Sequence, residues 1–454
     1  MKLLFKSIFI FVLSLNQWLL VAQGEFFLKN DVSKKINFEF ASNLIIIPVE
    51  INGVSLSFVL DTGVRKPILF NLTERDSLDL KNTKTFYLQG LGGDGKLKAL
   101  KSSSNRFQIG DAVGLNKDLY VVFDKTINFT PRLGVLVHGI IGYDLFKDFV
   151  VEVNYSSKYI RLHKTKGFKP KTSKKWKSIP IDIHKSKPYV NAAVTINNNQ
   201  KPVKLLIDTG SSDALWLFED ERKGLVPNND LFFRDYLGKG LSGSVYGKRS
   251  RINAFELSSF VLEDVNVAYP DTLSVDLARI YKERNGSLGG DILKRFNLFF
   301  DYENNKLYLK KNARFKDSFT YNNSGIVLEY NGTRFVREKI KITDRGNYNS
   351  NSNVDTSRPI QIDFSVDYRI ALKPIYKVVE LRETSSAFIS GLRVGDILIS
   401  VNGNEVYDYK LPEINAVFHG KTGKNVRLEV EREGKKMIFR FKLDDVFKKN
   451  ERSN

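Results

Sequence analysis

The 454-residue sequence contains no cysteine and few histidines. Without cysteine there is no disulfide framework, thiol nucleophile, lipid-modified cysteine or thiolate zinc cluster. The four histidines, His138, His163, His184 and His419, are widely spaced and offer little for a metal site or a catalytic triad. We therefore expect no metal or organic cofactor, and a fold that is stabilised by packing alone.

Acidic residues are outnumbered, since Lys and Arg exceed Asp and Glu by 20. Such a balance can indicate binding to nucleic acid or to an anionic membrane surface. Here the lysines are scattered, and no nucleic-acid-binding module is recognisable. The excess therefore predicts a solvated basic surface and no nucleic acid partner.

Long apolar runs are confined to the N-terminus. Residues 1–24 have a basic start, an apolar stretch and small residues placed for cleavage before Glu25, which is typical of a signal peptide. The alternative is an anchor helix, but the uninterrupted apolar stretch is short for a bilayer. We expect an exported protein, in the periplasm, on the outer surface or secreted, with no stable membrane span after cleavage.

The remaining apolar runs, such as LIIIPVEI and VKLLI, are short and rich in β-branched residues. Gly and Pro recur between them, so the pattern favours many strands over long helices. With 42% apolar residues the chain can build buried cores for two to four domains. We predict a mainly β protein.

One internal repeat sets the architecture. Asp61-Thr62-Gly63 and Asp208-Thr209-Gly210 are each flanked by apolar runs and lie 147 positions apart. The later segments 140–162 and 287–309 align with the same offset, which pairs Gly142 with Gly289. Two homologous lobes follow, each with a strand hairpin that leads into its aspartate.

Two equivalent lobes packed about a pseudo-twofold axis would bring Asp61 and Asp208 face to face in a poorly solvated floor. Two adjacent carboxylates cannot readily both ionise, so the pair holds one proton over a wide pH range. One carboxylate can then take a proton from a bound water while the other protonates a peptide carbonyl.

The rest of each tripeptide has a supporting role. Gly63 and Gly210 allow the backbone to approach water and substrate closely. Thr62 and Thr209 can hydrogen-bond across the junction of the lobes. Between each tripeptide and its later glycine lies a Gly-rich turn that predicts a hairpin tip, and the glycines of these turns are Gly90, Gly92, Gly93, Gly240 and Gly243.

With these residues in place, the region from about 30 to 315 resembles the pepsin and retropepsin family of aspartic peptidases. The resemblance implies two β-barrel lobes, a structural loop behind the site at Gly142 and Gly289, and two flaps made by the Gly-rich turns. Ser211 matches the family pattern, whereas Val64 replaces a residue that in the family helps to hold the carboxylate ionised. Asymmetric protonation or lower activity is therefore expected.

The C-terminal third has a different pattern and resembles a PDZ domain over roughly 370–445. The matching features are a Ser-Ser-Ala helix start, the run Gly391 to Leu398 and a Val-Asn-Gly turn. The resemblance implies binding of an extended C-terminal peptide, with Gly325, Ile326 and Val327 as the candidate binding loop. A domain used only for packing or dimerisation is an equal alternative.

The sequence thus predicts a signal peptide (1–24), lobe one (25–170), lobe two (171–318) and a PDZ domain (319–450) with a polar insertion around 344–357. Our hypothesis is an exported aspartic endopeptidase that acts on polypeptide substrates, with the PDZ domain used for peptide recognition or regulation. The alternative is a catalytically weak protein that binds peptides in the groove between the lobes and in the PDZ domain.

Overall fold

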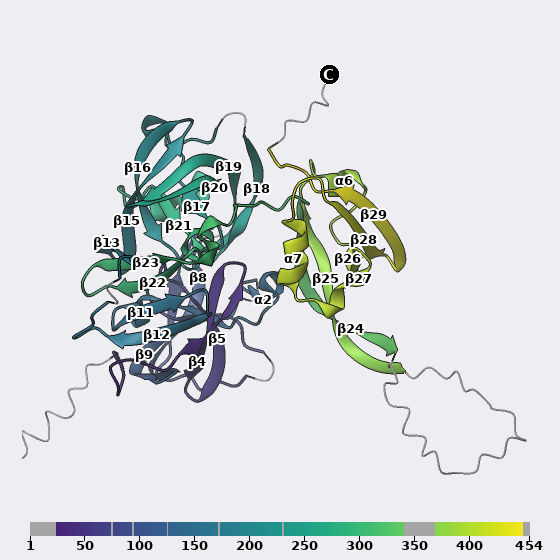
Figure 1. Cartoon of the computed structure of the whole chain (residues 1–454). Helices are drawn as coiled ribbons and strands as arrows, with labels where there is room; N and C mark the ends of the chain where they lie inside the picture. The colour runs from purple at the N-terminus through teal and green to yellow at the C-terminus, as the bar shows by residue number, and fades with distance from the viewer. Residues whose placement is uncertain are drawn as a thin grey trace, which may run out of the picture. The chain divides into compact units, whose positions relative to one another are not determined.

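The computed structural model describes residues 24–447 except 74–75, 93–94, 125, 171–172, 229–230 and 340–367. The predicted signal peptide up to residue 23, Gly93 and the polar insertion at 344–357 lie outside this part. The chain divides into two compact units, the first spanning 1–323 with 445–454 and the second 324–444. The mainly β fold is confirmed (Figure 1).

Lobe one is built on a nine-stranded sheet, counted over the described residues. Strands β5 and β10 run parallel at its centre, and β5 ends directly before Asp61. In sheet order the strands are β1 (Phe26–Phe27), β9 (Ala112–Val122), β6 (Ile68–Leu69), β10 (Gly139–Ile141), β5 (Val54–Leu60), β4 (Leu44–Ile51), β8 (Leu97–Ile109) and β7 (Lys84–Leu88), with β3 (Glu39–Ala41) beside β4.

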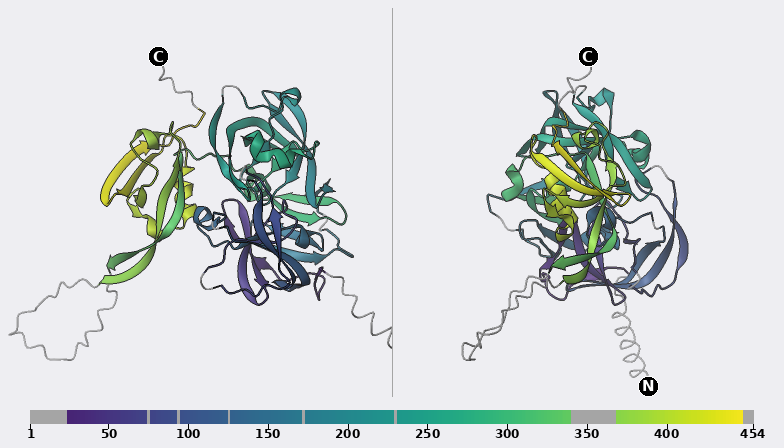
Figure 2. Two further views of the ribbon diagram at one scale, coloured as in Figure 1. Left: turned by 180° about the vertical axis from the view of Figure 1, so that it is seen from behind. Right: turned by 90° about the vertical axis from the view of Figure 1, so that its right-hand side faces the viewer.

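Lobe two repeats this plan. Strands β16 and β21 run parallel, and β16 ends directly before Asp208. In sheet order the strands are β14 (Asp182–His184), β15 (Lys187–Ile196), β16 (Asn199–Ile207), β21 (Gly286–Leu288), β17 (Leu215–Leu217), β20 (Phe260–Pro270), β19 (Gly243–Leu257) and β18 (Phe232–Gly240). Both views of Figure 2 show these teal and green strands above the purple and blue strands of lobe one.

The predicted hairpins that lead into the aspartates are present. The turn between β4 and β5 is Asn52-Gly53, and the turn between β15 and β16 is Asn197-Asn198; all four residues have positive φ. Asn and Gly accept this left-handed backbone with little strain, which explains why these dipeptides mark the turns.

A third sheet joins the lobes. Its order is β13 (Lys177–Pro180), β23 (Lys306–Lys311), β22 (Phe296–Asp301), β11 (Phe149–Asn154), β12 (Tyr159–Lys164) and β2 (Ile36–Asn37). At its centre β11 pairs antiparallel with β22, and Glu152 lies opposite Phe299, its own counterpart in the repeat. The pseudo-twofold axis therefore passes between these two strands, which confirms that the lobes pack symmetrically.

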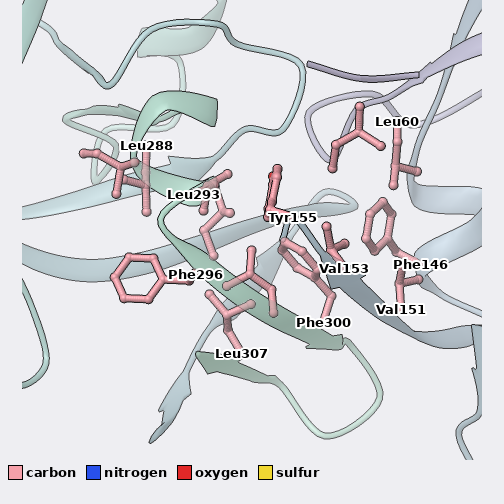
Figure 3. Close-up of a cluster of buried hydrophobic side chains, with 14 of the residues drawn as sticks. Leu60, Phe146, Val151, Val153, Tyr155, Leu288, Leu293, Phe296, Phe300 and Leu307 are labelled. Atoms are coloured by element: carbon pink, nitrogen blue, oxygen red, sulfur yellow. The ribbon is translucent and has the colours of Figure 1, made fainter. Parts of the chain in front are cut away.

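Side chains from both lobes fill one core above this sheet (Figure 3). Leu60, Val151 and Phe146 from lobe one pack in the same cluster as Leu288 and Phe300 from lobe two. Short helices connect the strands: α2 (Thr130–Leu133), α3 (Tyr143–Phe146), α4 (Thr272–Arg279) and α5 (Gly290–Leu293), with 3₁₀ turns at Glu221–Lys223 and Ala313–Lys316.

The second unit is one sheet with its own buried core. The strand order is β24 (Ile326–Lys339), β25 (Tyr368–Leu381), β26 (Ile397–Val401), β28 (Asn425–Arg432) and β29 (Lys435–Lys442), with β27 (Asn404–Glu405) beside β26. Helices α6 (Ser386–Ile389) and α7 (Leu411–Phe418) and a 3₁₀ turn at Val406–Asp408 complete it. Leu398, Leu411 and Phe418 are among its buried residues.

Candidate active site

The two predicted aspartates meet where the lobes join. Asp61 and Asp208 are half-buried, and they interact with each other through their charges and a side-chain hydrogen bond. A backbone hydrogen bond holds each aspartate. The Asp61 N–H donates to Ile141 O (2.8 Å), and the Asp208 N–H donates to Leu288 O (2.9 Å). Strands β10 and β21 therefore position both aspartates in the same way.

The two threonines link the lobes. The Thr62 N–H donates to Thr209 Oγ1 and the Thr209 N–H donates to Thr62 Oγ1, both at 3.0 Å. The hydroxyls in turn donate to the opposite strand, Thr62 to Ile207 O (2.6 Å) and Thr209 to Leu60 O (2.7 Å). Both side chains are fully buried, so this symmetric network holds the aspartates in register.

The glycines of both tripeptides lie against the carboxylates. The Gly63 N–H donates to Asp61 Oδ1 (2.6 Å) and the Gly210 N–H donates to Asp208 Oδ1 (3.1 Å). A Cβ on Gly210 would lie 2.5 Å from Asp61 Oδ2, and a Cβ on Gly63 would lie 3.0 Å from Asp61 Oδ1 and 3.5 Å from Asp208 Oδ1. Any side chain here would therefore displace the pair.

Gly142 and Gly289 lie behind the site, as predicted. A Cβ on Gly142 would overlap the Asp61 carbonyl oxygen, and one on Gly289 would lie 3.0 Å from Ser211 Oγ. Ser211 thus packs against this loop, and its N–H donates to Asp208 O (3.3 Å). Val64, at the corresponding place in lobe one, lies against Gly142 in the same way and also packs against the apolar cluster of that lobe.

The surroundings of the two carboxylates are asymmetric. Burial and the charge of Asp208 raise the pKa of Asp61 to about 7, and the charge of Lys187 opposes that rise. Burial also raises the pKa of Asp208, where the positive charges of both Arg284 and Lys187 oppose the rise. The pair therefore shares one proton at neutral pH.

Two hairpins, one from each lobe, meet at their tips. In lobe one β7 and β8 carry Gly90 and Gly92 at their tip, and in lobe two β18 and β19 carry Gly240 and Gly243 at theirs. The tips bond to each other: the Gly90 N–H donates to Ser242 Oγ (3.0 Å), and the Ser242 N–H donates to Leu91 O (2.9 Å). These glycines therefore lie where two flaps would meet, and Ser242 is a contact that the sequence did not single out.

Gly325, Ile326 and Val327 belong to the second unit. They occupy the start of β24, which is an edge strand of its sheet. Ile326 is buried, and the Gly325 carbonyl accepts a bond from the Arg382 N–H (2.9 Å). The position at an edge strand fits addition of a peptide strand, although Ile326 itself belongs to the core.

The sequence did not identify Lys187 and Arg284 as residues of the site. Nothing in their local sequence distinguishes them from the other basic residues, of which the chain has 71 in all. No group of three or more His, Asp or Glu side chains in the described part of the chain is arranged to hold a metal ion. Nor does any helix there have the length and apolar character needed to cross a membrane.

Comparison with known proteins agrees with this geometry. The family model described as aspartyl protease matches residues 47–145 and 192–292, one match in each lobe, and a PDZ domain model matches 378–432. The chain is therefore a two-lobed protein of the aspartic protease type with a C-terminal PDZ domain.

Among solved structures, the chain is similar to the aspartic proteinase from Irpex lacteus. The two are 12% identical, the match covers 63% of this chain and 99% of the other, and the TM-score is 0.39. No curated protein gave a significant match.

Proposed function

We propose that this protein is an exported aspartic endopeptidase that cleaves polypeptides with a water molecule activated between Asp61 and Asp208. The observation that carries the proposal is the meeting of two half-buried, mutually interacting carboxylates at the junction of two equivalent lobes. Export rests on the signal-like N-terminal segment alone.

The chemistry follows from the single shared proton. We assign the negative charge to Asp208, on which both Arg284 and Lys187 act. This carboxylate accepts a proton from the water as the water oxygen attacks the peptide carbonyl carbon. Asp61 donates its proton to the carbonyl oxygen, and a tetrahedral diol forms. Proton transfer to the amide nitrogen then allows the C–N bond to break, so that no covalent enzyme intermediate is required.

Substrate entry requires the hairpin tips to separate. Opening would break the bonds of Ser242 to Gly90, Leu91 and Gly95. It would also withdraw Leu91 and Leu241 from the apolar cluster of the opposite lobe. Closure over a bound peptide would exclude water from the site. A peptide that passes under two tips continues on either side of the aspartates, which suits an endopeptidase. The PDZ domain would recognise or regulate substrates by adding a peptide strand at β24.

A second candidate is a peptide-binding protein with weak catalysis. It is favoured by Val64, because the carboxylate of Asp61 receives its backbone bond from Gly63 and gains no hydroxyl from residue 64. Both candidates predict peptide binding, so turnover separates them.

The test is cleavage of a peptide library by the purified protein between acid and neutral pH, followed by mass spectrometry. Asp61→Asn and Asp208→Asn should each lower the rate by roughly 10²-fold to 10⁴-fold, because each removes a proton-transfer group. Asp264→Asn, the same change at an exposed aspartate, is the control. Cleavage that survives both substitutions at the site, or is absent from the unaltered protein, would reject the endopeptidase.

A further inference from the structure

The two lobes differ in charge at one corner beside the aspartates. Strands β4 and β15 begin at Leu44 and Lys187, each directly after a two-residue turn with positive φ. Each strand then pairs with the strand that ends at the aspartate of its lobe, with Ile46 opposite Val59 and Tyr189 opposite Leu206. Since Val59 and Leu206 both stand two residues before an aspartate, Leu44 and Lys187 occupy equivalent positions.

A second pair of equivalent positions shows the same contrast. Val137 and Arg284 each stand two residues before the central strand of their sheet, β10 or β21. In lobe one, Leu44, Val137 and Ile140 are buried in one apolar cluster. The equivalent residues of lobe two are Lys187, Arg284 and Ser287. The corner of lobe one is thus apolar, and the corner of lobe two is cationic.

The charge of Arg284 is not matched by a carboxylate bond within the described residues. The side chain is only 7% exposed, and two of its nitrogens donate to neutral oxygens: Nε to Gly286 O (3.0 Å) and Nη2 to Ser287 Oγ (2.7 Å). These bonds fix the guanidinium in place without neutralising it. The negative charge that acts on this guanidinium is that of Asp208, and a buried cation needs such a partner.

Lys187 adds a second cation at the same place. Its side chain is half-buried and forms no ion pair or side-chain hydrogen bond in the part of the chain that the structure describes. The charged groups that act on it are Arg284, Asp208 and Asp61. The aspartate pair with its one shared proton supplies a single negative charge against these two cations, so this corner keeps a net positive charge.

We propose that the corner formed by Lys187, Arg284 and Ser287 is a subsite for an acidic side chain of the substrate, next to the bond to be cleaved. A glutamate or aspartate carboxylate there would pair with the Lys187 ammonium and complete the charge balance. The equivalent corner of lobe one would receive an apolar side chain. This inference rests on the proposed function, since it assigns the substrate class of the same site.

The test compares matched peptides that differ only in Glu or Gln at one of the two residues flanking the cleaved bond. The opposite residue is Phe in all of them, so that each peptide offers an apolar side chain to lobe one. For the unaltered protein, kcat/KM for one Glu peptide should exceed that of its Gln partner by roughly tenfold or more, because a charge-assisted hydrogen bond is gained.

Lys187→Met should bring that ratio close to one while the Gln peptide is still cleaved, and Lys187→Glu should favour a peptide with Lys at that position. Lys185→Met removes the same charge from an exposed residue of the same hairpin and should leave the ratio unchanged. A ratio of one in the unaltered protein overturns the subsite. So does a Lys187→Met variant that loses both peptides equally, because Lys187 would then serve only the aspartate pair.

A binding measurement separates failure of the subsite from failure of the proposed function. The same peptides, with a hydroxyethylene group in place of the cleavable amide, are titrated against the protein by calorimetry. Tighter binding of the Glu form that Lys187→Met abolishes would support the subsite even if no peptide is hydrolysed. Equal binding of the Glu and Gln forms would reject it even if hydrolysis occurs.

Discussion

The two lobes share a frame but differ in the side chains that surround their aspartates. The frame comprises the crossed threonine bonds, the parallel strand pairs and the glycines behind each aspartate. Around Asp61 lie Val64 and an apolar cluster, whereas around Asp208 lie Ser211, Lys187 and Arg284. In this frame each threonine bonds to its counterpart, so a change of one threonine would also remove a partner of the other. The side chains around the frame can differ between the lobes without loss of these bonds.

Apart from the aspartates themselves, the glycines of the two tripeptides should give the largest effect on activity. The two glycines are equivalent in the repeat but lie at different distances from the carboxylates. A methyl group on Gly210 would lie 2.5 Å from Asp61 Oδ2, whereas one on Gly63 would lie 3.0 Å from Asp61 Oδ1, a tight contact that a smaller shift relieves. Gly210→Ala should therefore lower kcat/KM by about 10²-fold or more, since a misplacement near 1 Å has that effect. Gly63→Ala should lower it less.

The measurement is kcat/KM for both variants on one peptide that the unaltered protein cleaves. Circular dichroism and thermal unfolding would show whether each variant is folded. Equal losses in two folded variants would mean that the aspartates are placed symmetrically, and the contrast between the glycines would be wrong.

The pH dependence of stability should also differ between the lobes. The pKa of Asp61 is raised from an ordinary 3.8 to about 7, so the folded chain holds this proton more tightly than the unfolded chain does. The stabilisation is complete below about pH 4, where both states are protonated, and is lost as the pH rises through about 7. Unfolding temperatures should therefore fall across this window.

Asp61→Asn removes the titrating group and should flatten that fall more than Asp208→Asn does, because the cations beside Asp208 oppose the rise of its pKa. Melting curves of the three proteins at several pH values between 4 and 8 would check this. A steeper dependence in Asp61→Asn than in the unaltered protein would contradict the proposed placement of the proton.

The symmetric features could be predicted from sequence, and the asymmetric ones could not. Asp61, Asp208 and their threonines were identified by the repeat, whose constant offset carries over to the pairing of Glu152 with Phe299. The 147-position offset does not hold for the first hairpin of each lobe. There Leu44 and Lys187 occupy equivalent positions but lie 143 positions apart. Lys187 therefore could not be placed beside the aspartates until the strand register was known.

The contact between the flaps was beyond prediction for a similar reason. The Gly-rich turns predicted two hairpin tips, but Ser242 and Gly90 are 152 positions apart and come from different lobes. Their bond depends on how the lobes pack, which no local pattern encodes. Likewise the sequence placed the start of the second unit at 319, although Phe319 and Tyr321 are buried in the first unit, whose long segment ends at Asn323 before β24.

The smallest expected effect tests whether residue 64 causes the asymmetry at Asp61. Val64→Ser would add a hydroxyl where the family pattern has one, and a bond from it to the Asp61 carboxylate would stabilise the ionised form. The pKa of Asp61 should then fall by roughly half a unit to one unit, the equivalent of one hydrogen bond. The loss of activity on the alkaline side would begin at a correspondingly lower pH. Val64→Ala is the matched control, because it removes the same methyl groups from the lobe-one cluster without adding a donor. If the pH profiles of the two variants coincide, the hydroxyl at this position has no influence on Asp61, and the cations of lobe two alone account for the asymmetry.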